Sequence, residues 1–171
     1  MIKLAGAAII LIATTWIGVE YSRGLKERPM HLRLFGTALQ TLEAEIMYGH
    51  APLNEAARRI APQMPKPLDR FFLHFAEQLE QSESTAKLSW EAGLAAVWSD
   101  TALTETDKDI LLQFGENLGK HDRLTQQKQI MLTTSHLERE ENAARARQGQ
   151  YEKMIKSLGF LSGLLLIILL L

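Results

Sequence analysis

Two apolar runs lie near the ends of the chain, and a polar segment with helical periodicity separates them. Residues Leu4–Val19 and Leu158–Leu171 contain no charged side chain. A 16-residue helix rises about 24 Å, and the neighbouring Lys3 and Lys156 can extend toward the membrane surface. The pattern predicts three parts: an N-terminal transmembrane helix over residues 1–22, a central helical domain over 23–152, and a C-terminal transmembrane helix over 153–171.

Cations next to the two apolar runs predict the orientation in the membrane. They lie on the side of the central segment, at Arg23, Lys26, Arg28 and Arg33 after the first run and at Arg145, Arg147, Lys153 and Lys156 before the second. The positive-inside rule places the central segment in the cytoplasm and both termini on the far side. A cleaved signal peptide is the alternative for the first run. Residues 18–21 lack its small-x-small cleavage pattern, which favours a retained anchor.

The central segment repeats apolar residues at helical spacing. Phe35, Leu39, Leu42 and Ile46 form one stripe of a helix from Met30 to Tyr48, with Gly49 as its stop and Pro52 opening a short second helix. Similar stripes predict three more helices. Their members are Leu68, Phe71, Phe72, Phe75 and Leu79 for the third, Trp90, Leu94, Val97 and Trp98 for the fourth, and Ile110, Leu111, Phe114 and Leu118 for the fifth.

Cap residues mark several helix ends. Thr85 is a candidate N-cap of the fourth helix, and Thr104 followed by Asp107 resembles a capping box for the fifth. Gly119 is expected to end the fifth helix and Asp122 to cap the sixth. Because no β-strand pattern is seen, the predicted class is all-α: an antiparallel helical bundle flanked by membrane helices.

The sixth helix is predicted to run without interruption from Leu124 into the apolar tail, over roughly 75 Å. Between Glu138 and Gln150 its only apolar residues are alanines, so this portion is predicted to project from the bundle as a polar stalk. Gly149 is a candidate hinge within it. Gly159 and Gly163 form a small-xxx-small pair in the tail, suited to close packing against another membrane helix.

Composition narrows the chemistry. The formal net charge is −1 and the chain has no cysteine, so it offers no basic field for nucleic acid and no thiolate for catalysis or metal binding. The five histidines have no metal-ligand spacing and are predicted at surface or helix-end positions: His31, His50, His74, His121 and His136. We expect no metal, no cofactor and no enzymatic activity.

Three patterns resemble catalytic or ligand sites, and each has a structural interpretation. Residues 115–120 have three residues between their glycines where a P-loop needs four, and are read as a helix stop. Glu43 and Glu45 point apart at i, i+2, which favours ion pairs over an acid–base pair. The aromatic residues at helical spacing are predicted to form the core rather than line a pocket, namely Phe71, Phe72, Phe75, Trp90 and Trp98.

A family resemblance rests on motifs spread along the whole chain. They are Ala13–Trp16, the run Leu42–Leu53 (LEAEIMYGHAPL), Phe114-Gly115, Leu118-Gly119, His121-Asp122-Arg123, Gln126, Lys128, and Lys156–Gly163 (KSLGFLSG). Together they resemble the stage III sporulation protein AB family. That resemblance implies a cytoplasmic domain similar to the F protein of type II secretion systems, and a place in the channel between mother cell and engulfed forespore.

The resemblance also implies partners. These are the channel's cytoplasmic ATPase, of the stage III sporulation AA type, and further membrane subunits of the same complex, in the mother-cell membrane facing the forespore. The chain would be a non-catalytic, oligomeric platform that couples the ATPase to the channel. The residues predicted for partner contact or local structure are Glu43, Glu45, Tyr48, Gly49, Pro52, Gly119, Asp122, Arg123 and Gln126.

Two other hypotheses remain open at this stage. One is a membrane-anchored adaptor that recruits a partner without joining a channel. The other is a small membrane enzyme that uses Glu43, Glu45 and His50.

Overall fold

A computed structural model describes the backbone of residues 25–49, 51–81, 84–119 and 123–170, and their side chains except those of 123, 152 and 155–170. The first helix covers residues 25–44 and continues as the π-helical turn η1 (Glu45–Gly49). The remaining elements are α2 (Leu53–Ile60), η2 (Ala61–Gln63), α3 (Leu68–Leu79), α4 (Ala86–Val97), η3 (Trp98–Asp100), α5 (Glu105–Asn117) and α6 (Arg123–Leu170).

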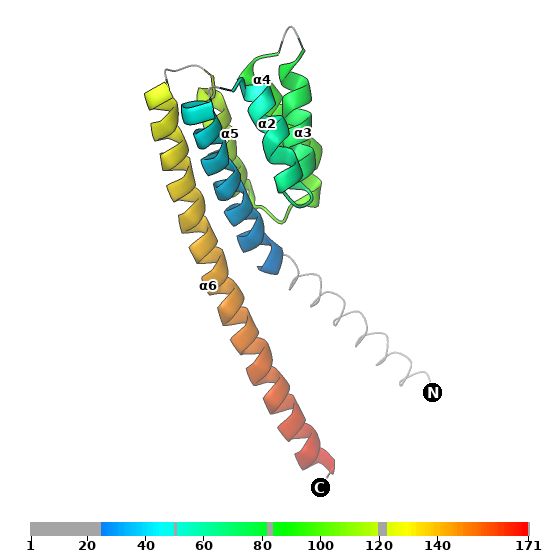
Figure 1. Ribbon diagram of the computed structural model, residues 1–171. Coiled ribbons are helices and arrows are strands. Elements are labelled where there is room, and N and C mark those ends of the chain that lie inside the picture. The colour runs from blue at the N-terminus through cyan, green and yellow to red at the C-terminus, as the bar shows by residue number, and fades with distance from the viewer. Residues whose placement is uncertain (1–24, 50, 82–83, 120–122, 171) are drawn as a thin grey trace, which may run out of the picture.

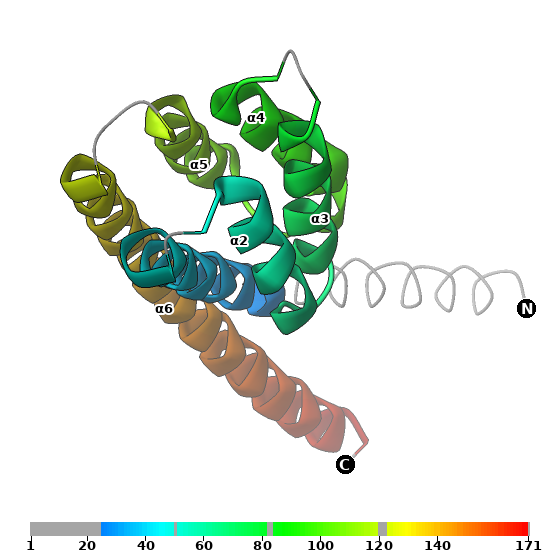
Figure 2. The same cartoon turned by 45° about the horizontal axis from the view of Figure 1, so that its top comes forward.

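The helices form an up-and-down bundle (Figure 1). Consecutive helices pack on one another, α2 on α3, α3 on α4, α4 on α5 and α5 on α6. The first helix lies beside α6 and runs antiparallel to it in both views (Figures 1 and 2). The all-α prediction is confirmed for the described residues, in which every regular element is helical.

An aromatic cluster centred on Trp90 fills the core. The indole packs edge to face on Phe71, Phe75 and Phe114, with ring centroids 4.8, 5.2 and 5.0 Å away. Its Nε1–H donates to the carbonyl oxygen of Leu111 at 2.8 Å, so the one polar atom of the ring is satisfied. The predicted core assignment is therefore confirmed for these aromatics.

The apolar stripe of the first helix faces the same core. Phe35, Leu39 and Leu42 are fully buried, as its spacing predicts. Trp98 departs from the core prediction, because it is only half-buried at the end of α4 and Lys108 Nζ lies 4.9 Å from the centre of its ring. The reason is position: the 3-10 turn η3 carries Trp98 away from the core-facing side of α4.

The caps predicted for α4 and α5 are present, whereas Asp122, the predicted cap of α6, lies outside the described residues. Thr85 Oγ1 accepts a hydrogen bond from the backbone N–H of Leu88 at 3.2 Å, at the start of α4. At the start of α5, Asp107 Oδ2 accepts from the backbone N–H of Thr104 at 2.8 Å and from its hydroxyl at 2.9 Å. Gly119 follows α5 with a φ of +77°, a left-handed conformation that suits glycine after a helix.

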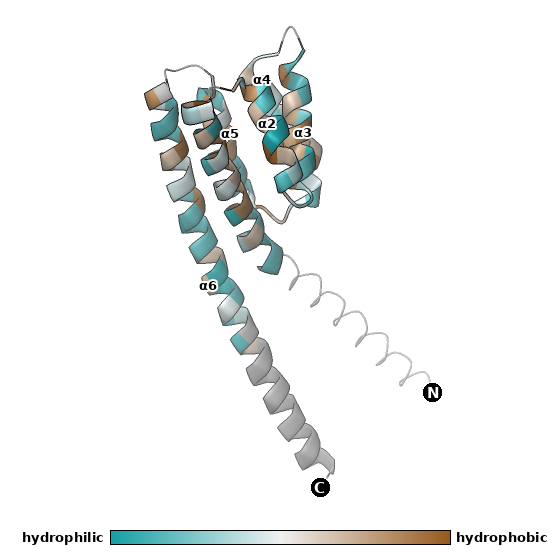
Figure 3. Ribbon diagram, viewed as in Figure 1, coloured by the Kyte–Doolittle hydropathy of each residue, from teal (hydrophilic) through white to brown (hydrophobic). Residues whose placement is uncertain are grey.

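Helix α6 is continuous over 48 residues, which corresponds to roughly 70 Å. It extends well past the other helices, and its coloured portion is largely hydrophilic (Figure 3). The stalk prediction for residues 138–150 is wrong in part. Glu140 accepts a hydrogen bond from Arg28 at 3.0 Å, and Ala144 is only 4% exposed. The first helix begins before the predicted Met30, so this portion of α6 packs along it.

The membrane helices predicted from the sequence lie outside what the structure describes in detail. Residues 1–22 are not described, and residues 155–170 are described only as helical backbone. Among the described residues, no helix combines the length and the apolar character needed to cross a membrane.

Candidate partner-binding surface

The residues predicted for partner contact lie in two segments, 43–53 and 118–128, which meet at one end of the bundle. Residues 43–53 include the end of the first helix and the start of α2, and residues 118–128 include the start of α6. Both lie at the end of the bundle opposite the direction in which α6 extends (Figure 1). We call this end, formed by the described residues of 43–53 and 118–128, the distal end.

A side-chain hydrogen bond joins the two segments. The Nε2–H of Gln127 on α6 donates to Glu43 Oε1 on the first helix at 2.7 Å, in a partly buried position. Glu45 instead binds α2, since its carboxylate accepts from Arg59 Nη1 at 2.9 Å. The two carboxylates therefore make separate contacts, as their i, i+2 spacing predicts, and each ties a different helix to the first one.

The turn after the first helix is fitted closely around Glu45. A Cβ atom at Gly49 would lie 2.9 Å from Glu45 Oε2, so the glycine leaves room for the carboxylate. Pro52 follows with φ −57° and ψ 151° as the N-cap of α2, and its carbonyl accepts the first helical hydrogen bond, from the backbone N–H of Ala56 at 3.0 Å. The predicted break near Gly49 and restart at Pro52 are confirmed.

Large apolar side chains are exposed at the distal end. The Tyr48 ring is 82% exposed and Leu124, in the first turn of α6, is 70% exposed. Exposed aromatic side chains such as tyrosine are typical anchors of protein interfaces, and an exposed leucine adds apolar contact area. The distal end therefore offers contact residues on a framework fixed by the bonds from Glu43 and Glu45.

The other predicted site residues are placed less completely. Gly119 is described, and a Cβ there would lie 3.2 Å from that of Ala86. Gln126 is half-buried on α6. Arg123 begins α6, but its side chain and all of Asp122 lie outside the described residues. Gly159 and Gly163 lie in the helical backbone of α6, where side-chain surroundings are not described.

A buried ionic cluster is the feature that sequence reasoning missed. Arg28 Nε and Nη2 donate to Asp107 Oδ2 and Oδ1, both at 2.8 Å, and Nη2 also donates to Glu140. The three side chains join the first helix, α5 and α6. One signal was available: Arg28 lies seven residues before Phe35, on the apolar stripe that faces the core. Arg28 is therefore more than one of the cations that flank the first apolar run, because its side chain also joins three helices of the bundle.

The pKa shifts in this cluster have clear causes. Burial alone would raise the pKa of Asp107, but hydrogen bonds from Arg28 and from the Thr104 backbone and hydroxyl outweigh it and lower the pKa. The same hydrogen bond from Arg28 raises the pKa of its guanidinium, against the opposing effect of burial. Both groups are therefore charged at neutral pH, and the cluster is a structural ion pair.

One histidine contradicts the surface prediction. His31 is buried, and its Nδ1 accepts the backbone N–H of Ala102 at 3.2 Å. Burial lowers its pKa, with a smaller opposing effect of Glu27. It lies on the same face of the first helix as Arg28, three residues away, which places it against the loop before α5. His74 and His136 are more accessible, and His50 and His121 lie outside the described residues.

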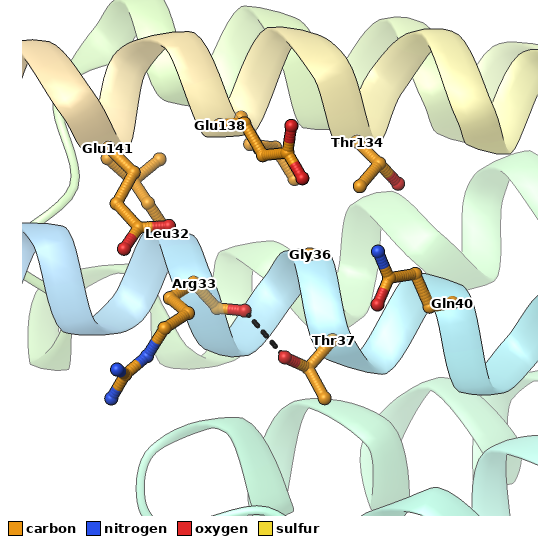
Figure 4. A pocket seen from close by; sticks show the side chains of 9 residues that line it. Leu32, Arg33, Gly36, Thr37, Gln40, Thr134, Glu138 and Glu141 are labelled. Carbon is orange, nitrogen blue, oxygen red and sulfur yellow. Dashed lines mark hydrogen bonds between the residues drawn. The ribbon is translucent and has the colours of Figure 1, made fainter.

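A small polar groove separates the first helix from α6 (Figure 4). It holds about 130 Å³ and is lined in part by Gly36, Gln40, Thr134 and Glu138. Thr134 Oγ1 is buried there without a hydrogen-bond partner, whereas Thr37 Oγ1 donates to the Arg33 carbonyl at 3.0 Å. The groove is smaller than the roughly 300 Å³ of small-molecule sites. Among the described residues, no group of three or more potential ligands is placed to hold a metal.

Comparison with known proteins decides the family. The model of the family described as stage III sporulation protein AB matches residues 3–171. The chain belongs to the stage III sporulation protein AB family. Stage III sporulation protein AB of Bacillus subtilis (strain 168) is 50% identical over 170 residues, which cover 99% of each chain. The resemblance inferred from the sequence motifs is thus confirmed, and with it a role in sporulation.

A solved structure agrees with the bundle described here. A chain of stage III sporulation protein AB superposes with a TM-score of 0.69 at 45% sequence identity. The match covers 72% of this chain and 98% of that chain. The helical architecture is therefore shared with an experimentally determined family member.

Proposed function

We propose that this stage III sporulation protein AB family member is a non-catalytic platform subunit of the channel between mother cell and forespore. Two membrane anchors, residues 1–22 and 153–171, would hold it in the mother-cell membrane with the bundle in the cytoplasm. The distal end would dock the cytoplasmic ATPase of the channel, and Gly159 and Gly163 would pack against other membrane subunits.

The observation that carries this proposal is the convergence of the two segments at the distal end. α6 leads in the opposite direction, toward the predicted C-terminal membrane helix, so the distal end would face away from the bilayer (Figure 1). A cytoplasmic ATPase can reach such a surface. The exposed Tyr48 supplies an aromatic anchor of the kind found at protein interfaces, and the exposed Leu124 supplies apolar contact area.

A coupling subunit must also be rigid, and the bundle offers two links that serve this purpose. The Glu43–Gln127 hydrogen bond fixes the end of the first helix to α6. The Arg28–Asp107–Glu140 cluster joins the same two helices near the start of the first helix and adds α5. A force applied at the distal end would pass along both helices toward the predicted anchors.

Site-specific photocrosslinking in sporulating cells tests the proposal. Photoreactive residues replace Tyr48 and Leu124 in the full chain, and Leu73 on α3, which is 42% exposed, serves as the control outside the distal end. We expect the ATPase to be captured from the first two positions and not from Leu73. Capture from Leu73 alone would contradict the distal assignment. Capture only of proteins unrelated to the channel would favour the adaptor.

Affinity provides a second test of the same surface. Tyr48→Ala is expected to weaken ATPase binding by the full chain at least tenfold, as truncation of an interface anchor does. Leu73→Ala is the matched control and should leave binding unchanged. If both variants bind like the wild-type protein while the wild-type complex forms, the ATPase docks elsewhere on the bundle.

A further inference from the structure

A cleft opens where the first helix begins beside α6, far from the distal end. It holds about 230 Å³ and is lined by Leu25 of the first helix and by Arg147, Gln150, Tyr151 and Met154 of α6. Leu25 is the first described residue of the chain, and Met154 is the last residue of α6 whose side chain is described. In the sequence, the predicted membrane helix 153–171 begins at the cleft, and the predicted membrane helix 1–22 ends three residues before Leu25.

The lining combines an apolar wall with a polar edge. Leu25, Tyr151 and Met154 provide hydrocarbon and aromatic surface, while the Arg147 guanidinium and the Gln150 amide provide hydrogen-bond donors. None of the five lining residues is acidic. A guanidinium binds phosphate oxygens well, and a tyrosine suits the boundary between water and lipid. Phosphate beside hydrocarbon is the chemistry of a phospholipid at its headgroup.

The charge around the cleft favours an anion. Lys26 and Lys153 are exposed and adjoin the lining residues Leu25 and Met154 in sequence. Together with Arg147 they make three basic residues around the cleft. The neighbouring sequence contains two acidic residues, Glu27 and Glu152, so positive charge is in excess. Arg145, by contrast, is already paired with Glu141 at 2.6 Å. Basic clusters next to a membrane helix attract anionic lipids.

We propose that this cleft binds the phosphate headgroup of an anionic phospholipid. Arg147 and Gln150 would donate to the phosphate oxygens, and Leu25, Tyr151 and Met154 would contact the glycerol backbone and the first methylene groups. The volume suits a headgroup alone, with the acyl chains remaining in the bilayer. A lipid bound here would set the height of the bundle above the membrane. The inference rests on the membrane anchoring proposed above.

Lipid binding to the full-length protein in detergent tests the site. Native mass spectrometry compares the dissociation constants of phosphatidylglycerol and phosphatidylcholine with the same acyl chains. The wild-type protein is expected to bind the anionic lipid about fivefold more tightly, the contribution typical of one basic residue at an anionic surface. Arg147→Gln should remove this preference. Arg139→Gln makes the same change at an exposed position of α6 outside the cleft and should keep it.

Three results of this comparison would overturn the site. They are equal binding of both lipids by the wild-type protein, an unchanged preference in Arg147→Gln, and an equal loss in Arg139→Gln. Displacement of phosphatidylglycerol by millimolar inorganic phosphate would also overturn it, because the cleft would then take a free phosphate.

Flotation with phosphatidylcholine vesicles separates this inference from the proposed function. If the protein floats with the vesicles but shows no lipid preference in mass spectrometry, only the cleft assignment is lost and the membrane anchoring stands. Protein that does not float overturns the anchoring and the cleft together. The crosslinking test of the distal end is independent of both results.

Discussion

Arg28 and Asp107 form a deeply buried ion pair, and removing either partner should show how much the bundle depends on it. Arg28→Met removes the charge but keeps a long apolar side chain, and Asp107→Ala removes the carboxylate. The double variant Arg28→Met, Asp107→Ala combines these two changes and removes both charges. The three variants form a double-mutant cycle around one contact between the first helix and α5.

The expected magnitudes follow from burial. The side chain of Asp107 is 0% exposed and that of Arg28 is 10% exposed, so neither charge can be solvated well without the other. Breaking such a pair costs about 3–5 kcal/mol. We expect about 4 kcal/mol for Arg28→Met, which leaves Asp107 with only the Thr104 donors. We expect about 3 kcal/mol for Asp107→Ala, because Glu140 still pairs with Arg28.

The double variant separates pairing from mere loss of side chains. Removing both charges leaves no buried ion unpaired between the first helix and α5, and only Glu140, whose side chain is 20% exposed, loses a partner. The cost of the double variant should therefore fall short of the sum of the single costs by about 2 kcal/mol or more. Urea unfolding of the full chain in mild detergent, followed by tryptophan fluorescence and circular dichroism, measures all four proteins. Single costs below about 1 kcal/mol, or costs that add within about 0.5 kcal/mol, would refute the reasoning.

The pair also predicts a dependence of stability on pH. The pKa of Asp107 is lowered from its ordinary value of 3.8, so the folded carboxyl binds fewer protons than the unfolded one in acid. Its contribution is therefore complete above about pH 4 and is lost as the pH falls through the lowered pKa. The Asp107→Ala protein should lack this part of the acid-induced destabilisation, which unfolding curves below pH 4 would measure.

Three further substitutions, at His31, Gly115 and Gly149, test individual positions. Burial lowers the pKa of His31 from 6.5, so as the pH falls the unfolded state binds a proton before the folded state does. The free energy of unfolding should therefore decrease as the pH falls through 6.5, by at most about 1.4 kcal/mol at pH 5.5. His31→Gln should remove this fall in unfolding curves and the exposed His136→Gln should not; a fall unchanged in His31→Gln would count against the buried site. Gly115→Ala should cost about 1–3 kcal/mol, because its Cβ would overlap the Trp90 indole. A Cβ at Gly149 would meet nothing within 4 Å, so Gly149→Ala should stabilise α6 by about 0.5–1 kcal/mol. Equal shifts of the urea midpoint in Gly115→Ala and Gly149→Ala would contradict this packing.

The local structure followed from the sequence because its causes are local. The stripe of Phe35, Leu39 and Leu42 repeats at helical spacing, and that spacing alone predicts a helix with one buried face. Thr85 and the Thr104–Asp107 pair cap helices through bonds that span only three residues. The family motifs were equally accessible, since they are read directly from the order of residues.

The candidate surface could be predicted only in part. The turn at Gly49 and Pro52 and the junction at Gly119 were recognisable as chain features. Their meeting at one end of the bundle depends on the antiparallel packing of the first helix and α6, which the Glu43–Gln127 bond records over 84 positions of sequence. No local pattern specifies such a pairing, because it follows from how six helical segments share one core.

The sequence by itself determined the helices, most of their caps, the apolar terminal runs and the family. Each of these depends on residues close together in the chain, or on motifs that need no coordinates. Only the tertiary structure decided that Arg28 pairs with Asp107 and Glu140, that His31 is buried, and that residues 138–150 of α6 pack along the first helix. A polar side chain has the same spacing whether it faces water or a distant partner, so only the packed fold tells which of the two it does.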